Sequence, residues 1–337
     1  VLADRYPEKN RTQKDIWKYI IRGLVSNMKN KDVSIQMIRI LSMTSIILCH
    51  LVQELNNSTI AKTGQFFNVG VYIFLFLSGW LYGQKSIQNA FSWMLGRVKK
   101  VLVPMWIFML FLFGIHAYQG TMKLKYIPIY LSNTQYWLGK IGGGAHLWFI
   151  SVIFLCYLVT PFLQKIKKRL IIVILILIAV GDGLCYLSHV GGMTILYTSV
   201  YIIGYYFRNK EKEITEVNAV AIIILSLIIR LVSMKYLDGT VIYDCLLVYL
   251  THTALAIGLF SLSRKIFDLK SRSSIDWFDD ISYFVYITHY MFMVGPLRTM
   301  GLTSNLLLNT IITVTLSFFS ATLLQRIYRT VIMENIK

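Results

Sequence analysis

The sequence predicts an all-α, polytopic membrane protein of about ten transmembrane helices, preceded by an amphipathic helix at the membrane interface. Hydrophobic residues make up 56% of the 337 residues, and they form about ten continuous apolar runs of a length that can cross a bilayer. The runs are continuous rather than alternating, which excludes a β-barrel. Because lipid cannot hydrogen-bond the backbone, we expect each run to be a helix.

The distribution of Lys and Arg predicts the orientation of these helices. If the N-terminus is inside and each span crosses the membrane in the opposite direction to the one before, 26 of the 34 basic residues lie in inner segments and 6 in outer segments. Arg39 and Arg230 lie within spans. An excess of cations on the inner side is typical of cytosolic loops. We therefore expect both termini in the cytosol. The net charge of +18 then reflects topology, anionic lipid and an anionic cytosolic ligand rather than nucleic acid.

The N-terminal segment, residues 1–33, is expected to be cytosolic. Within it, residues 15–29 place apolar side chains at helical spacing and Lys or Arg on the other side. This pattern is typical of an amphipathic helix lying on the membrane, although an ordinary packed helix has the same pattern.

The transmembrane domain is expected over 34–325, followed by a basic cytosolic tail at 326–337. Gly70, Ser78 and Gly79 would let the second span pack closely, and Pro104 lies in the first turn of the third, where proline is tolerated. A glycine-rich stretch ends the long outer loop before His146. The predicted spans are 34–53, 65–83, 101–118, 146–163, 170–187, 193–207, 217–234, 242–263, 281–297 and 304–325.

The first span carries two costly side chains, Arg39 and His50. Eleven residues advance an ideal helix by about 1100°, so the two lie about 20° apart in azimuth and about 16 Å apart along the axis. Ionisable groups inside a span are candidates for function, although both side chains would also be tolerated by reaching the interface or a neighbouring helix. Histidine is the residue type suited to general base catalysis near neutral pH.

Glu54 follows His50 by four residues. A continuing helix would place its carboxylate on the face of His50, where it would orient the imidazole. The alternative is a solvated carboxylate in the outer loop.

Two further groups are candidates for binding. Arg97, Lys99 and Lys100 lie at the inner end of the third span, where cations either mark topology or bind phosphate groups. The second group would contact a sugar from the outer side or mid-span. For this group the alternatives are an interfacial Trp anchor and a core histidine with satisfied hydrogen bonds. Its members are His146, Trp148, Tyr283, Tyr286 and His289.

Five segments, in order over about 34–325, resemble the acyltransferase-3 superfamily of integral membrane O-acyltransferases. Arg39 and His50 are similar to its R-x10-H signature. Lys100 replaces the second arginine of its R-x-x-R motif, which keeps the charge and loses the bidentate fork. Ile153 stands where many members have glutamate, a resemblance to the branch that modifies bacterial surface polysaccharides. The other four segments are FFNVGVYIFLFLSGWLYG (66–83), RVKKVLVP (97–104), HLWFISVIFLCYLVTP (146–161) and ISYFVYITHY (281–290).

This resemblance implies transfer of an acetyl or other small acyl group from cytosolic acyl-CoA to a hydroxyl of a cell-surface or lipid-linked glycan. Acetyl-CoA is the expected donor. We expect Arg39, Arg97, Lys99 and Lys100 to hold the phosphates of coenzyme A, and His50 to deprotonate the hydroxyl. A covalent acyl-histidine intermediate remains open.

Other features of the sequence leave alternative functions open. Buried Arg, His and Asp would also suit a transporter or flippase for a glycan or small polar solute, but no repeat symmetry supports this. A membrane sensor or partner subunit with an inactive site is a third reading. The four cysteines show no paired spacing, so we expect neither a zinc site nor a disulfide framework. A homo-oligomer, or association with glycan-synthesis machinery, is left open.

Overall fold

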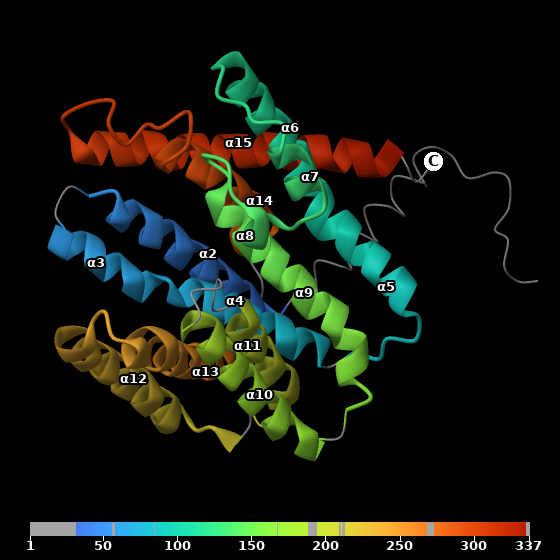
Figure 1. The fold of residues 1–337 in the computed structure, drawn as a ribbon, viewed down its shortest axis with the longest axis vertical. Helices are drawn as coiled ribbons and strands as arrows, with labels where there is room; N and C mark the ends of the chain where they lie inside the picture. Colours follow the sequence, from blue (N-terminus) through green and yellow to red (C-terminus); the bar gives the residue numbers. More distant parts are fainter. Residues whose placement is uncertain are drawn as a thin grey trace, which may run out of the picture.

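The computed structural model describes residues 32–55, 58–83, 85–166, 168–187, 194–208, 210, 213–267 and 273–334, and within these ranges it contains helices and no strand (Figure 1). The all-α fold class is therefore confirmed. The amphipathic helix expected over 15–29 lies outside the described residues.

The helices follow one another through short connections. The longer ones are α2 (Val33–Gln53), α3 (Ser58–Phe67), α4 (Val69–Tyr82), α5 (Ala90–Arg97), α6 (Val103–Tyr118), α9 (Trp148–Leu163), α10 (Lys168–Leu187), α11 (Thr194–Phe207), α12 (Glu216–Leu237), α13 (Val248–Ile266), α14 (Ser273–Met293) and α15 (Leu306–Glu334). The short ones are the π-helices η1 (Val98–Leu102) and η4 (Ile242–Leu247), the 3-10 helix η2 (Ala145–Leu147), α7 (Tyr126–Leu131) and α8 (Gln135–Leu138).

Each of the ten predicted spans coincides with a helix, but their lengths differ. Seven helices of the described chain are long and apolar enough to cross a membrane. The other three predicted spans correspond to α10, α11 and α14. The apolar part of α10 covers only Leu170–Gly181, and the 14 residues of α11 rise about 21 Å, less than a typical hydrocarbon core.

Several helix boundaries differ from the predicted ones. The second span is broken at Asn68 into α3 and α4, and the third begins early, because α5 and η1 continue into α6. Helix α14 starts at Ser273 rather than 281, so three acidic residues are helical. Helix α15 continues to Glu334, so most of the predicted tail from residue 326 is helix.

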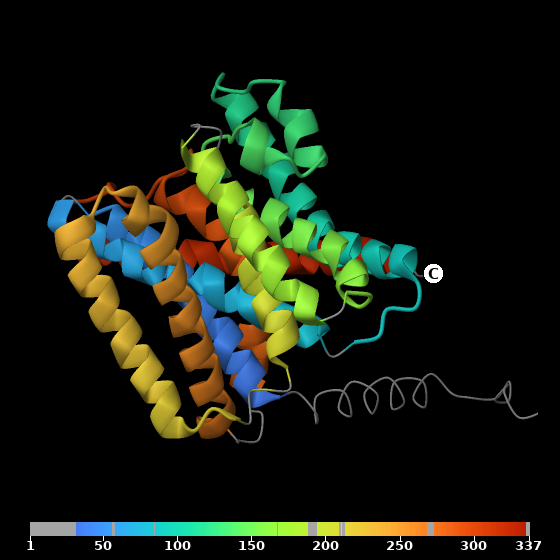
Figure 2. The ribbon, with the colours of Figure 1, turned by 60° about the horizontal axis from the view of Figure 1, so that its bottom comes forward.

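Helix α4 lies at the centre of the bundle. It contacts α2, α11 and α13, and its Leu75 and Phe76 are fully buried. Helix α2 in turn contacts α14, which packs against α15 on the far side of the bundle from the α12–α13 pair (Figure 1). The two helices of that pair lie side by side at one edge of the molecule (Figure 2). The core therefore runs from α15 through α14, α2 and α4 to α13.

Glycines let α4 and α11 meet backbone to backbone. A Cβ atom on Gly79 would overlap the carbonyl oxygen of Tyr201, and one on Gly204 would overlap the carbonyl oxygen of Phe76. Small residues at such contacts are what allow membrane helices to approach closely. The close packing that Gly79 predicts for the second span is therefore explained by this contact with α11.

We expect Gly204→Ala to destabilise the protein, because the new methyl group has no room between α4 and α11. Overpacking of this kind costs about 1–3 kcal/mol. Gly114→Ala in α6 is the matched control, since a Cβ there meets nothing within 4 Å. Thermal unfolding in detergent should show a lower midpoint for Gly204→Ala only, and equal midpoints would contradict this packing.

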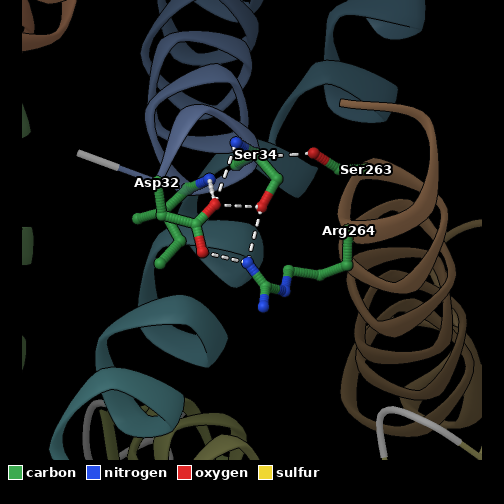
Figure 3. A network of polar contacts seen from close by, with 5 residues as sticks. Asp32, Ser34, Ser263 and Arg264 are labelled. Carbon is green, nitrogen blue, oxygen red and sulfur yellow. Dashed lines mark hydrogen bonds and ion pairs between the residues drawn. The ribbon is translucent and has the colours of Figure 1, made fainter. Parts of the chain in front are cut away.

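The start of α2 is held to the end of α13 by a polar network (Figure 3). Asp32 caps α2 by accepting hydrogen bonds from the backbone of Ser34 and Ile35, and its carboxylate also pairs with Arg264. Arg264 donates to the hydroxyl of Ser34 over 2.8 Å, and Ser263 donates to the Ser34 carbonyl over 3.1 Å. Helix capping and interhelical contact are thus provided by the same carboxylate.

Asp32 makes this network sensitive to acid. Partial burial raises the pKa of its carboxyl, but the hydrogen bonds from Ser34 and Arg264 and the charge of Arg264 outweigh burial and lower the pKa below its usual value of 3.8. A lowered pKa contributes stability above the unfolded-state value, and that stability is lost as the pH falls through the folded-state value. Asp32→Asn should therefore lower the unfolding midpoint at pH 7, with a difference from wild type that shrinks below about pH 4. A difference that is constant with pH would contradict the ionic contribution.

Candidate functional site

Helices α2 and α14 run in the same direction and present polar side chains to each other. Gln36 donates to Asp276 over 2.7 Å, and Arg39 contacts Asp279 over 3.0 Å, each across 240 positions of sequence. The ring of His50 lies 4.8 Å from that of Tyr290, at the same offset. The stripe predicted on the first span therefore faces a matching stripe on α14.

Three histidines meet at the far end of this seam. The His289 ring lies 5.5 Å from that of His50 and 4.9 Å from that of His146. Tyr290 packs against both His50 and His146. The cluster combines α2, η2 and α14, so three predicted site residues from distant parts of the chain are brought together. We refer to His50, His146 and His289 as the histidine cluster.

In the neutral form of two of these rings, backbone carbonyls determine which nitrogen carries the proton. His289 Nδ1 lies 2.8 Å from the carbonyl oxygen of Tyr286, and His146 Nε2 lies 3.1 Å from that of Ile287. A carbonyl only accepts, so each of these nitrogens donates. The remaining nitrogens, His289 Nε2 and His146 Nδ1, then bear lone pairs, and both are buried without a partner among the described residues. The cluster thus offers two acceptors suited to a hydroxyl donor.

The predicted aromatic site residues have other partners. Tyr286 donates its hydroxyl to the His146 carbonyl over 2.6 Å, and Tyr283 donates to the carbonyl of Val101 over 2.6 Å. Trp148 packs on the ring of Tyr197, 5.1 Å away. The tyrosine hydroxyls therefore hold α14 against η1 and η2, and only their rings remain to contact a ligand.

A small cavity lies along the seam between α2 and α14 and ends next to a neighbour of the histidine cluster. Its volume is about 20 Å³, enough for a water molecule. One end is at Arg39, and the other reaches Tyr286, whose ring lies 5.2 Å from that of His146. The lining residues are Arg39, Ser42, Met43, Ile46, Phe74, Phe149, Ser282, Tyr283 and Tyr286.

A basic group lies near the Arg39 end. Arg97 donates to the hydroxyl of Tyr82, and its guanidinium lies 5.2 Å from the centre of the Tyr82 ring, 5.6 Å from that of Trp93 and 6.0 Å from that of Tyr157. The charges of both Arg97 and Arg39 act on Tyr82, which places the two arginines at the same end of the bundle.

Two lysines extend this group. Lys100 lies within electrostatic reach of Arg97 and of Lys85, and Lys99 and Lys100 are exposed. Lys85 was not predicted, although it follows the second span in the same inner segment as Arg97. We call Lys85, Arg97, Lys99 and Lys100 the basic group.

Glu54 and Arg39, two predicted site residues, have ion-pair partners that the sequence did not predict. Helix α2 ends at Gln53, and Glu54 pairs its carboxylate with Arg298 over 2.8 Å, so the contact expected with His50 is replaced by an ion pair. Arg39 is paired with Asp279, whose side chain is only 3% exposed. Asp279 was missed because acidic residues near a span resemble loop residues, although their spacing continues the polar stripe of α14.

Removing the negative charge of Asp279 should destabilise the protein, because Arg39 would lose its counter-ion inside the bundle. Hydrogen bonds to charged groups contribute about 1.5–3 kcal/mol. Asp280→Asn is the matched control, since Asp280 is exposed on the same helix. A lower unfolding midpoint for Asp279→Asn than for Asp280→Asn is expected. Identical midpoints would show that the ion pair contributes nothing.

A family model described as an acyltransferase domain, that of the acyltransferase-3 family, matches residues 32–325 of the chain. The chain belongs to this family. The resemblance inferred from the sequence is confirmed, and the protein is a membrane acyltransferase. No curated protein and no solved structure matches the chain. The matched range contains α2 through most of α15, and hence every residue of this acyltransferase's histidine cluster and basic group.

Proposed function

We propose that the protein transfers an acetyl or other small acyl group from cytosolic acyl-CoA to a hydroxyl of a cell-surface or lipid-linked glycan, with His50 as general base. The observation that carries this proposal is the placement of His50 in the histidine cluster, at the end of the α2–α14 seam opposite Arg39, with a small cavity that runs from Arg39 to Tyr286, beside His146. An acyl donor held at Arg39 and a hydroxyl held at the cluster would approach each other through that cavity.

The basic group is suited to the phosphates of coenzyme A. Arg97 offers a planar set of donors held by aromatic rings, and Lys85, Lys99 and Lys100 add positive charge nearby. Arg39 remains 36% exposed despite its ion pair, so it can contact the donor as well. With both termini in the cytosol, these cations face the compartment that supplies acyl-CoA.

The small cavity favours a short acyl group. At about 20 Å³ it must widen to admit the pantetheine arm, and each added methylene of the acyl chain would need more room. Its apolar lining, with Met43, Ile46 and Phe149, would shield the thioester from water. Acetyl-CoA carries a short acyl group that requires little further widening, and it is therefore the proposed donor.

The histidine cluster can position and activate the hydroxyl. His146 Nδ1 and His289 Nε2 are free to accept hydrogen bonds from neighbouring sugar hydroxyls. His50 takes the proton of the reacting hydroxyl while its oxygen attacks the thioester carbonyl. The carbon–sulfur bond then breaks, and the proton passes to the departing thiolate. General base catalysis contributes about 10²–10⁴-fold in rate.

Transfer from radiolabelled acetyl-CoA into cell-surface polysaccharide, in membranes containing the protein, tests this function. We expect His50→Ala to slow transfer by about 10²–10⁴-fold, because the base is removed. His116→Ala is a control histidine, since both His116 ring nitrogens are engaged by Thr121 and Gly142, away from the cluster.

Each outcome of this assay is informative. Full transfer by a folded His50→Ala protein would exclude His50 as the base. Label from succinyl-CoA but not from acetyl-CoA would change only the donor. No transfer from either donor, together with glycan movement across liposome membranes, would replace the proposed reaction with transport.

A further inference from the structure

A second buried polar cluster lies outside the proposed catalytic site. Arg230 of α12 is 2% exposed, and His252 of α13 is 1% exposed. The two are within electrostatic reach of each other, and the charge of Arg230 also acts on Tyr72 of α4. We call Arg230, His252 and Tyr72, with the neighbouring rings of Tyr243 and Phe66, the Arg230 cluster.

Aromatic rings surround both polar groups. The Arg230 guanidinium lies 4.7 Å from the centre of the Tyr243 ring and 5.7 Å from that of Phe66. The His252 ring lies 4.9 Å from that of Tyr72. Cation–π contacts stabilise a guanidinium without providing hydrogen-bond acceptors for its N–H groups.

The hydrogen-bonding capacity of this cluster is only partly used. Arg230 Nε and Nη1, and both ring nitrogens of His252, are buried with no partner among the described residues. Asp238 and Asp244 act on Arg230 electrostatically, but Asp238 forms its ion pair with Lys62 over 3.2 Å. Ionisable groups inside membrane helices that lack a protein partner mark ligand sites.

The Arg230 cluster adjoins the proposed acceptor site through a chain of rings. Tyr72 packs on Tyr197 at 5.4 Å, and Tyr197 packs on Trp148 at 5.1 Å. Trp148 follows η2, which carries His146. Phe74, on the same helix as Tyr72, lines the cavity that reaches Tyr286, whose ring packs against that of His146. A molecule spanning both sites would contact aromatic faces along its length.

We infer that Arg230 and His252 bind an oxyanion of the acceptor, either the phosphate of a lipid-linked sugar or the carboxylate of an acidic glycan. A guanidinium keeps its charge at any physiological pH, and its planar N–H groups match both anions. A neutral His252 adds one N–H donor. Only the statement that the ligand is the acyl acceptor rests on the proposed function. Binding of the oxyanion does not.

The test measures binding without an acyl donor, so that it is independent of transfer. The full chain, in phosphatidylcholine nanodiscs, is titrated calorimetrically with farnesyl monophosphate, with glucuronate and with uncharged farnesol. We expect one of the two anions to bind, and Arg230→Gln to weaken its affinity by about 30-fold or more. Lys235→Gln, which removes a positive charge at an exposed position of α12, should bind as wild type does.

The outcomes separate the sources of the anion. Binding of farnesyl monophosphate alone assigns the phosphate of a lipid-linked sugar, and binding of glucuronate alone assigns a glycan carboxylate. Binding of neither anion, or of farnesol as tightly as farnesyl monophosphate, would overturn the inference.

Milder variants guard against misfolding of Arg230→Gln. Arg230→Lys keeps the charge but loses the planar donors, and His252→Asn removes the ring. Both should weaken binding, and wild-type affinity in both would also overturn the inference.

Discussion

The ion pair between Arg39 and Asp279 is the interaction on which the arrangement of the site depends. The buried carboxylate of Asp279 needs a counter-ion, and its pairing with Arg39 sets α2 and α14 side by side in one register. Once that register is set, His50 reaches His289 and Tyr290 at the other end of the same two helices. A charge pair at one end thus positions imidazoles at the other.

The remaining helices complete the site from different directions. Helix η2 adds His146, and the hydroxyl of Tyr286 holds its backbone in place. Helix α4 forms the centre, with a glycine contact to α11 on one side and the seam of α2 on another. Helix α4 carries Phe74 toward the cavity and Tyr72 toward the Arg230 cluster, so one helix contributes an aromatic ring to each of the two polar regions. The acyl donor, the hydroxyl and the inferred oxyanion would then have separate places in one bundle.

Helix positions could be predicted from the sequence because apolar runs depend on local composition alone. The common face of Arg39 and His50 could be predicted too, because it needs only the geometry of one helix. Which residues contact each other across helices could not be predicted from the sequence. Asp279 lies in a stretch with too many acidic residues to resemble a span, and Glu54 pairs with Arg298 from the loop after α14. The Arg230 cluster depends on which helices become neighbours, and that is a property of the tertiary fold.

The parallel register has a consequence for how the chain can change in length. Arg39 and His50 are eleven residues apart, and so are their partners Asp279 and Tyr290. A single residue inserted between either pair would turn everything beyond it by about 100° and move it along the axis by about 1.5 Å. The far end of the seam would then lose its alignment while the near end kept its ion pair. Insertions and deletions are therefore excluded from these two eleven-residue intervals and confined to the connections between helices.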